Sequence, residues 1–318
     1  APIMQVGAVP VFVDIDIPSY NMDMSMLEKA YSNKTKAVFI AHSLGNPFNL
    51  KAAKEFCDSH NLWLIEDNCD GLGGTYELDG VTYKTGTIGD IGTSSFYPAH
   101  QMTMGEGGAV YSSNPLLHKI IRSMRDWGRE CVCTGGQDNL CGHRFDGQFG
   151  TLPAGYDHKY VYSHLGYNLK VTDMQAAIGA AQLKKLPGFV KARQEHWDYL
   201  RAGLDDMKDY YILPEKEKSS EPCWFGFILT VKPESGKNRN EIVKFLEDNN
   251  IQTRNLFAGN ITRHPCFEQF REGVDYRIAE TLEVTDHVMN NSFWVGVYPG
   301  MTTPMLDEMI KKIKEAVQ

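Results

Sequence analysis

The chain has 318 residues, 42% of them hydrophobic and 23% charged, and a formal net charge of −8. That length allows about two domains, and the composition is typical of a globular protein. The sequence shows no signal peptide and no apolar run of about 18 residues that could cross a membrane, which predicts a cytoplasmic protein. Without a Lys/Arg-rich stripe, nucleic acid is not expected as the main partner.

The first part of the chain alternates between apolar runs and amphipathic segments. Such alternation indicates βαβ units and a mostly parallel sheet covered on both faces. The predicted strands are residues 10–15, 36–41, 62–66, 93–97 and 108–112, and the predicted helices are residues 23–32 and 50–60.

The second part begins with a long irregular stretch, residues 129–165, rich in Gly, Cys, His and Asp. A loop of that length inside a compact domain is usually functional or disordered. Beyond it the pattern predicts a helical region at 171–204 kinked at Pro187, a strand at 224–231, and helices at 237–249 and 305–317. The chain thus divides into a large domain, 1–205, and a small α+β domain, 206–318.

Acidic residues follow the predicted strand 62–66, in the sequence Glu66-Asp67-Asn-Cys-Asp70. In open α/β sheets ligands bind at the carboxyl ends of the strands. A buried carboxylate at that edge needs a cation or a hydrogen-bond donor. Taken alone, a helix N-cap is the simpler explanation for such an Asp.

Between two predicted strands, a Gly-rich segment presents His100 shortly after Ser95. Hydroxyl groups and backbone amides at such a turn can hold a phosphate. A lone histidine is more often structural than catalytic, but this segment contains too much glycine to be explained by packing.

The cysteines form no disulfide scaffold in a chain of this length. Three of them make a C-x-C-x7-C pattern in the irregular stretch, which brings three thiolates near one point. That pattern suits a structural zinc site or a 2Fe-2S cluster, which needs a fourth ligand. The seven cysteines are Cys57, Cys69, Cys131, Cys133, Cys141, Cys223 and Cys266.

Taken together, several of these segments resemble the sugar aminotransferase family known as DegT/DnrJ/EryC1/StrS. The resemblance implies an α/β fold: the aspartate-aminotransferase (PLP fold type I) large domain and a small α+β C-terminal domain. Relative to the family, roughly the first third of the chain is missing, so we expect it to begin within a domain. The segments are Glu66-Asp67, Gly86-Thr-Ile-Gly-Asp-Ile-Gly92, Ser95-Phe-Tyr97, Gly105-Glu-Gly-Gly108, Leu165-Gly-Tyr-Asn168 and Thr172-Asp-Met-Gln-Ala-Ala177.

The resemblance also implies a cofactor site. Asp67 matches the aspartate that keeps the pyridine nitrogen of pyridoxal phosphate protonated, which lets the ring accept electrons. Asp70 stands where the family usually has His or Gln over the ring face. Ser95 matches a phosphate-binding serine. Asn168 matches an asparagine that reaches the phosphate of the neighbouring subunit's cofactor, which implies a homodimer.

His100 departs from the family pattern, which has the Schiff-base lysine at this position. Histidine forms no imine, but its pKa near neutrality suits a base. The departure resembles the 3-dehydratase branch, which uses pyridoxamine 5′-phosphate (PMP) and acts on CDP-linked sugars such as CDP-4-keto-6-deoxy-D-glucose. His100 would then remove a proton from the cofactor's C4′ carbon as the C3 hydroxyl leaves, on the route to 3,6-dideoxyhexoses of lipopolysaccharide O-antigen.

In that branch, the cysteine pattern implies a 2Fe-2S cluster that relays electrons from a separate flavin and iron–sulfur reductase. Its ligands would be Cys131, Cys133, Cys141 and, by position, Cys69, with Cys223 and Cys266 as alternatives for the fourth. Guanidinium groups bind phosphates in a forked geometry. The candidates for a nucleotide diphosphate are Arg122, Arg125, Arg129, Arg254 and Arg263.

Three other functions fit the same residues. A dehydratase that uses vitamin B6 but no cluster would contain no iron. An aminotransferase is disfavoured while position 100 is His. An inactive homologue, serving as a scaffold or regulator, would have no affinity for the cofactor.

Overall fold

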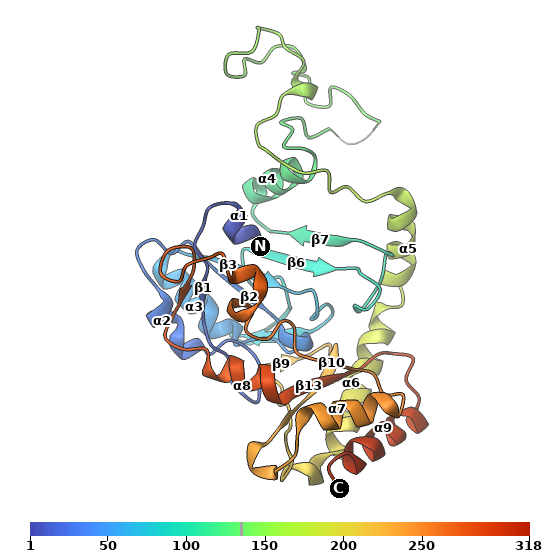
Figure 1. The fold of residues 1–318 in the computed structure, drawn as a ribbon. Coiled ribbons are helices and arrows are strands. Elements are labelled where there is room, and N and C mark those ends of the chain that lie inside the picture. The colour runs from blue at the N-terminus through green and yellow to red at the C-terminus, as the bar shows by residue number, and fades with distance from the viewer. Residues whose placement is uncertain (134–135) are drawn as a thin grey trace.

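The structure is a computed structural model that describes residues 1–133 and 136–318 (Figure 1). Its N-terminal helices and strands, with 3₁₀ helices labelled η, are α1 (Pro2–Gln5), β1 (Val11–Phe12), η1 (Met24–Met26), α2 (Leu27–Ala30), β2 (Ala37–Ala41), η2 (Ser43–Gly45), α3 (Leu50–His60), β3 (Trp63–Asp67), β4 (Thr75–Leu78), β5 (Val81–Lys84), β6 (Ile91–Ser95), β7 (Gly108–Tyr111) and α4 (Pro115–Arg125). The later ones are η3 (His158–Tyr160), α5 (Asp173–Leu183), α6 (Leu186–Gly203), η4 (Asp205–Met207), β8 (Tyr211–Ile212), β9 (Ser220–Glu221), β10 (Gly226–Val231), η5 (Pro233–Ser235), α7 (Arg239–Asp248), β11 (Thr253–Arg254), η6 (Ile261–Arg263), η7 (Pro265–Phe267), β12 (Arg277–Ile278), α8 (Glu283–Asn291), β13 (Ser292–Gly296) and α9 (Thr303–Glu315).

The N-terminal region is built on a four-stranded sheet with the order β2-β3-β6-β7. β2, β3 and β6 are parallel, and β7 runs antiparallel to β6. Because the parallel strands end at one edge, the register sets Ala41, Asp67 and Thr93 side by side. Val110 continues this row on β7.

One face of this sheet is packed and the other is open. Leu64 is buried together with α3, whose Leu50, Ala53 and Cys57 belong to the same core. On the other face, Phe39 and Val110 remain 44% and 49% exposed. We call this second face the open face.

α3 has the predicted bounds because its ends are marked by specific residues. The Asn49 side chain accepts a hydrogen bond from Ala52 N, and Asn61 adopts the left-handed conformation at the C-cap, an arrangement typical of helix ends. The predicted helical region 171–204 is two helices instead of one kinked helix. α6 begins just before Pro187 because proline is tolerated in the first turn of a helix.

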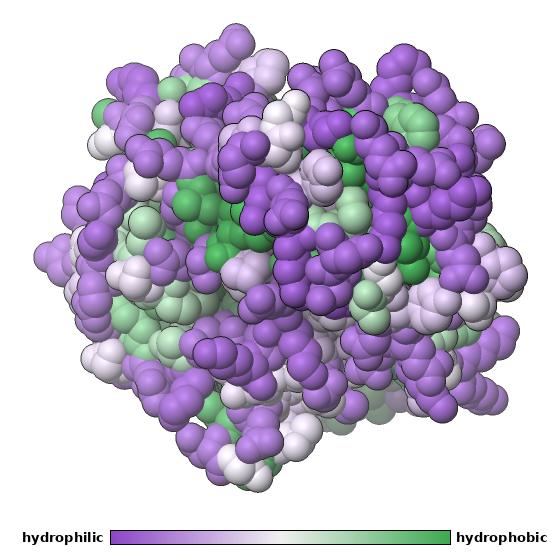
Figure 2. Space-filling model, turned by 90° about the horizontal axis from the view of Figure 1, so that it is seen from below, coloured by the Kyte–Doolittle hydropathy of each residue, from purple (hydrophilic) through white to green (hydrophobic). Residues whose placement is uncertain are grey.

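The C-terminal region contains an antiparallel sheet with the order β11-β13-β10-β8. All six residues of β10 are buried, and the core around them includes side chains from α6, α7 and α9. Seen from this side, the surface is mainly hydrophilic with separate apolar patches (Figure 2). Other strands of this region pair with the N-terminal one, β9 with β4 and β12 with β1. The domain boundary after residue 205 stays a prediction.

Between α4 and α5 the chain extends away from the rest of the molecule (Figure 1). Where this segment is described, its regular structure is limited to η3 and isolated bridges such as the one between Arg129 and Tyr162. This agrees with the irregular stretch expected at 129–165. None of the helices in the described ranges is long and apolar enough to cross a membrane.

Candidate active site

Asp67 ends β3 on the open face, in one row with Thr93. Its Oδ1 accepts hydrogen bonds from Cys69 N at 3.0 Å and from the Thr93 hydroxyl at 3.4 Å. Within the described ranges, its Oδ2 accepts none of the hydrogen bonds found. A half-buried carboxylate with one fixed and one available oxygen can accept a hydrogen bond from a protonated ring nitrogen.

The neighbouring Glu66 points to the opposite face and fixes the end of the strand. Its oxygens accept from His42 Nε2 at 3.0 Å and from the amides of Gly86 and Ile88, each at 2.7 Å. Burial raises the pKa of Glu66, but the hydrogen bonds from His42 and the backbone outweigh burial and hold that pKa below its usual range. Glu66 thus ties β3 to the turn before β6 and holds Asp67 in place.

His100 lies beside Asp70, with its Nδ1 3.3 Å from Asp70 Oδ1. Their side chains are only 16% and 11% exposed. Nδ1 makes no hydrogen bond of suitable geometry among the described residues, so the two side chains are close neighbours without a hydrogen bond at Nδ1. The imidazole also packs on Phe225, with 5.2 Å between ring centroids. The structure therefore brings the predicted base and Asp70 together against an aromatic wall.

Two buried side chains that sequence reasoning missed hold the His100 segment. Gln101 Nε2 donates to the carbonyls of Asp70 and Cys223. Arg193, on α6, donates to the carbonyls of His100 at 3.4 Å and Trp224 at 3.0 Å, and to that of Val297. The 97–101 turn is thereby fastened to segments far along the chain.

A sequence signal for Arg193 did exist. It occupies the helical spacing of the buried Trp197 and Leu200 on α6, so its charge falls on the apolar stripe of the helix. Burial lowers the pKa of the Arg193 guanidinium, and the nearby charge of Asp70 acts in the opposite direction. A buried cation that binds only carbonyls is costly, which indicates a positioning role.

Ser95 and Asn168 lie in different places. Ser95 is on β6, two residues after Thr93, so both side chains share the open face. Asn168 is exposed and forms an isolated bridge with Asp126 beyond α4. The structure shows no contact of Asn168 with Asp67 or His100, so its predicted role toward a neighbouring subunit stays a prediction.

The cysteines are only partly gathered. Cys131, Cys133 and Cys141 line one small cavity together with Arg144 and His158. The amide of Leu140 is the main factor that lowers the pKa of Cys133, whereas burial raises the pKa of Cys131.

Cys69 lies elsewhere, next to Asp67, with its sulfur 3.9 Å from the Thr93 hydroxyl. Burial raises the pKa of the Cys69 thiol to about 12. Among the described residues, no three His, Cys, Asp or Glu side chains are arranged to hold a metal ion. The residues present therefore do not fit a four-cysteine cluster as they stand, and the predicted ligand set stays a prediction.

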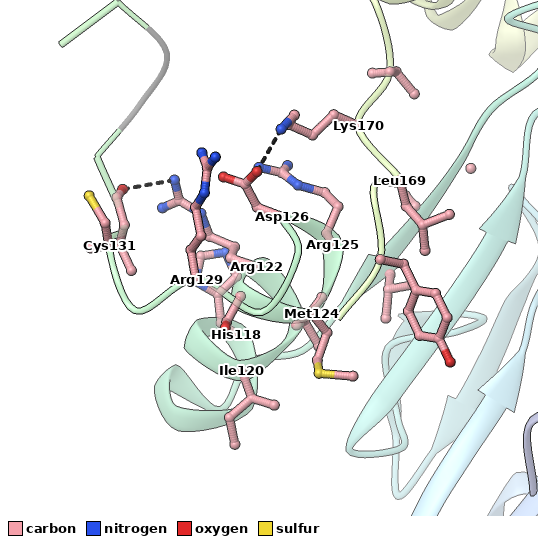
Figure 3. A pocket seen from close by; sticks show the side chains of 18 of the residues that line it. His118, Ile120, Arg122, Met124, Arg125, Asp126, Arg129, Cys131, Leu169 and Lys170 are labelled. Atoms are coloured by element: carbon pink, nitrogen blue, oxygen red, sulfur yellow. Dashed lines mark hydrogen bonds and ion pairs between the residues drawn. The ribbon is translucent and has the colours of Figure 1, made fainter. Parts of the chain in front are cut away.

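A cavity of about 1200 Å³ opens between the sheet and the end of α4. Thr93, Ser94 and Val110 line it on the sheet side. Its other wall carries the positively charged side chains of Arg122, Arg125, Arg129, Lys159 and Lys170. Figure 3 shows the three guanidinium groups gathered at the end of α4, with Lys170 reaching Asp126 from the segment opposite. We call this space the basic cavity.

The fold and these residues define a vitamin-B6-type enzyme scaffold with an unusual histidine. The profile of the DegT/DnrJ/EryC1/StrS aminotransferase family matches residues 1–314, and the chain belongs to this family. The predicted fold class is confirmed, because the similar solved structures are of fold type I.

Two curated relatives and one solved structure are especially informative. The chain is 55% identical over 314 residues to the lipopolysaccharide biosynthesis protein RfbH of Salmonella typhimurium, covering 99% of this chain and 70% of RfbH. It is 49% identical over 316 residues to the dTDP-4-dehydro-2,6-dideoxy-D-glucose 3-dehydratase of Saccharopolyspora spinosa, covering 99% of this chain and 66% of the relative. It also superimposes on the GDP-4-keto-6-deoxy-D-mannose-3-dehydratase of E. coli with bound hydrated PLP, at a TM-score of 0.84 and 26% identity, covering 100% of this chain and 76% of the other.

Proposed function

We propose that this protein is a PMP-dependent 3-dehydratase that acts on a nucleotide-linked 4-keto-6-deoxyhexose, CDP-linked in our assignment, in the biosynthesis of 3,6-dideoxyhexoses for lipopolysaccharide. The observation that carries the proposal is His100 at the family's lysine position, held beside Asp70 and against Phe225. The dehydratases among the similar proteins support the same reaction class.

In this proposal each residue has a defined task. When bound, the cofactor supplies a primary amine and an electron-accepting ring. The available Oδ2 of Asp67 holds the proton on the ring nitrogen, and the Ser95 hydroxyl binds a phosphate oxygen. His100 would take up the proton that the cofactor's C4′ carbon loses and would return it to the departing C3 hydroxyl, which would leave as water. The wall formed by Phe225 keeps water away from one side of the imidazole.

Substitution of His100 tests this assignment. With PMP and the CDP-linked 4-keto sugar supplied to the full-length protein, His100→Asn should slow loss of the C3 oxygen by a factor of about 10²–10⁴. His100→Lys should favour transamination. The matched control is His60→Asn, in the last turn of α3 and outside the residues that line the basic cavity. Wild-type loss of C3 oxygen in His100→Asn would refute the proposed base.

The more detailed part of the proposal is a 2Fe-2S cluster that a flavin and iron–sulfur protein would reduce. Its ligands would be Cys131, Cys133, Cys141 and Cys69. It is supported by the three thiols that share one cavity. Anaerobic reconstitution should give about two irons and two sulfides per chain, lost in Cys131→Ser. Iron content of Cys69→Ser, compared with that of Cys223→Ser and Cys266→Ser, decides the fourth ligand, because all three are free cysteines.

A dehydratase without a cluster is the second candidate. It is favoured by the position of Cys69, which lies next to Asp67 and outside the small cavity that the other three cysteines line. Tight PMP binding and C3 dehydration without iron would select it, whereas no PMP affinity would select the inactive homologue.

We also propose a homodimer. A run of apolar side chains is exposed around Asn168, and Leu165 is 97% exposed; an exposed apolar patch of this kind marks a protein interface. Sedimentation should show a dimer for the full-length protein and a monomer for the double variant Leu165→Asp, Met174→Asp. A wild-type monomer would contradict the proposal. The run consists of Tyr160, Tyr162, Leu165, Tyr167, Leu169, Val171, Met174, Ile178 and Leu183.

A further inference from the structure

We propose that the Tyr111 hydroxyl, on the packed face of the sheet, positions the two strand ends that carry Asp67 and Ser95 toward the cofactor. Tyr111 ends β7, and its neighbour Val110 lies on the open face in one row with Thr93. Because successive side chains of a strand alternate between faces, Tyr111 points to the packed face. The inference rests on the proposed function, since it deepens the assignment of Asp67 and Ser95 as cofactor-binding residues.

The Tyr111 hydroxyl contacts one residue beside each of these two. It accepts a hydrogen bond from Asn68 Nδ2 at 3.3 Å and lies 3.0 Å from Ser94 Oγ, where either oxygen can donate. Asn68 directly follows Asp67, and Ser94 directly precedes Ser95. A cofactor that touches both Asp67 and Ser95 spans the ends of β3 and β6. One hydroxyl therefore joins these two strand ends from behind, and a shift between them would weaken both contacts.

The polar groups around this hydroxyl are shielded from water. Asn68 and Ser94 are buried, and burial raises the pKa of Tyr111, so its hydroxyl keeps its proton at neutral pH. Asn68 Nδ2 also donates to the Thr85 carbonyl at 3.1 Å, and the Asn68 amide donates to the Thr93 carbonyl at 2.9 Å. Buried hydrogen bonds are costly to leave unmade, so this network resists movement of either strand end.

Two glycines leave room for the Tyr111 side chain. A Cβ atom on Gly86 would collide with the Tyr111 hydroxyl oxygen, and one on Gly92 would collide with the Tyr111 ring. Packing alone would be satisfied by phenylalanine in the same space. Glu66 ties β3 to the turn before β6, whereas the Tyr111 hydroxyl joins the ends of the two strands. That placement indicates positioning in addition to packing.

Titration of the full-length protein with PMP tests the inference without relying on turnover. Tyr111→Phe removes only the hydroxyl, and we expect PMP affinity to fall about tenfold, as for the loss of one hydrogen bond. The ring nitrogen of bound PMP, followed by its absorption band, should also lose its proton at a lower pH, because a displaced Asp67 stabilises the charged ring less. The matched control is Tyr76→Phe, which should bind PMP as the wild type does. Tyr76 is a buried tyrosine whose hydroxyl bonds to Asn49 and to the Lys51 amide.

A double variant tests the coupling to Ser95. If Tyr111 acts through the strand end of Ser95, Ser95→Ala should lower PMP affinity by a smaller factor in Tyr111→Phe than in the wild type. Independent residues would instead give two losses that multiply. Ser94→Ala removes the other partner of the hydroxyl and should resemble Tyr111→Phe. Thermal unfolding shows whether each variant is folded, and Ser94→Ala provides the test if Tyr111→Phe does not fold.

The inference is overturned if Tyr111→Phe keeps the wild-type PMP affinity or the wild-type pH of ring deprotonation, or if the two losses of affinity multiply. These results would leave the proposed dehydratase function standing. PMP affinity that depends on Tyr111, without any C3 dehydration, would instead refute the proposed function and support the positioning role. A wild type that binds no PMP would overturn both.

Discussion

The surroundings of His100 and the segment 129–165 carry the two groups of reactive side chains, and they are held in opposite ways. Around His100, the buried Gln101 and Arg193 donate to carbonyls from distant parts of the chain. In the described part of the segment 129–165, several of the side-chain contacts are solvent-exposed ion pairs, such as the one between Lys159 and Asp138.

This difference indicates which geometry is fixed before anything binds. Buried hydrogen bonds to the backbone are costly to break, whereas exposed ion pairs contribute little. The base is therefore held rigidly, and the cysteine-bearing segment can open locally at low cost. If Cys131, Cys133 and Cys141 hold the proposed cluster, we expect binding of the cluster to complete their arrangement.

The largest effect on stability should come from removing the side chain of Glu66. Glu66→Ala leaves His42 and several backbone amides without their buried partner, which should lower the free energy of unfolding by about 3–5 kcal/mol. The measurement is denaturant unfolding, with the exposed Glu77→Ala as control. Equal stability of the two variants would show that the end of β3 is not held as described.

Replacing Arg193 should have the next largest effect on stability. Arg193→Met leaves the carbonyls of His100 and Trp224 without a donor, at a cost of about 1–3 kcal/mol. Because the His100 segment shifts, kcat should fall while KM changes little, and Arg193→Lys should recover part of kcat. A loss of stability with kcat unchanged would reduce Arg193 to a structural role.

The pH dependence of stability separates the two regions further. The pKa of Glu66 is held below its ordinary value of 4.5, so its contribution is present above that pH and is lost as pH falls through the lowered folded pKa. We expect unfolding free energy to decrease on acidification below about 4.5, and Glu66→Gln to flatten this decrease. If the unfolding free energy of Glu66→Gln changed with pH as that of the wild type does, the lowered pKa of Glu66 would be contradicted.

The smallest effect on stability should come from the segment 129–165. The Arg144 guanidinium lowers the pKa of Asp157 to about 2, but the pair is only partly buried and lies in an irregular segment. Asp157→Asn should leave the unfolding midpoint unchanged and speed limited proteolysis between residues 129 and 165. A clear drop in the midpoint would mean that this segment is part of the cooperative core.

Parts of the fold could be predicted because local residues determine them. α3 was placed correctly within the alternating pattern of the first part of the chain, and the stretch 129–165 was recognised from its lack of periodicity. The β4–β5 hairpin was missed although its turn sequence, Asp79-Gly80, is a typical hairpin signal. In the structure both residues have the positive φ that such a turn requires. Exposure of the open face could not be predicted, because an apolar strand residue does not reveal what covers it.

The candidate site likewise contains residues that local motifs reveal and residues that only the folded structure reveals. Asp67 and His100 could be proposed from the sequence because motifs place them at the end of β3 and in the turn after β6. Gln101 and Arg193 act through carbonyls of residues far away in sequence, and no local pattern reveals such partners. The position of Asn168, exposed and away from Asp67, depends on how the segment after the irregular stretch returns to α5.

Mass spectrometry of the CDP-linked sugar after a single turnover with PMP, comparing wild type with His100→Asn, tests the central claim most directly. The account predicts that the wild type removes the C3 oxygen and that His100→Asn binds PMP with unchanged affinity but leaves the oxygen in place. Removal of the oxygen at the wild-type rate by His100→Asn would contradict it.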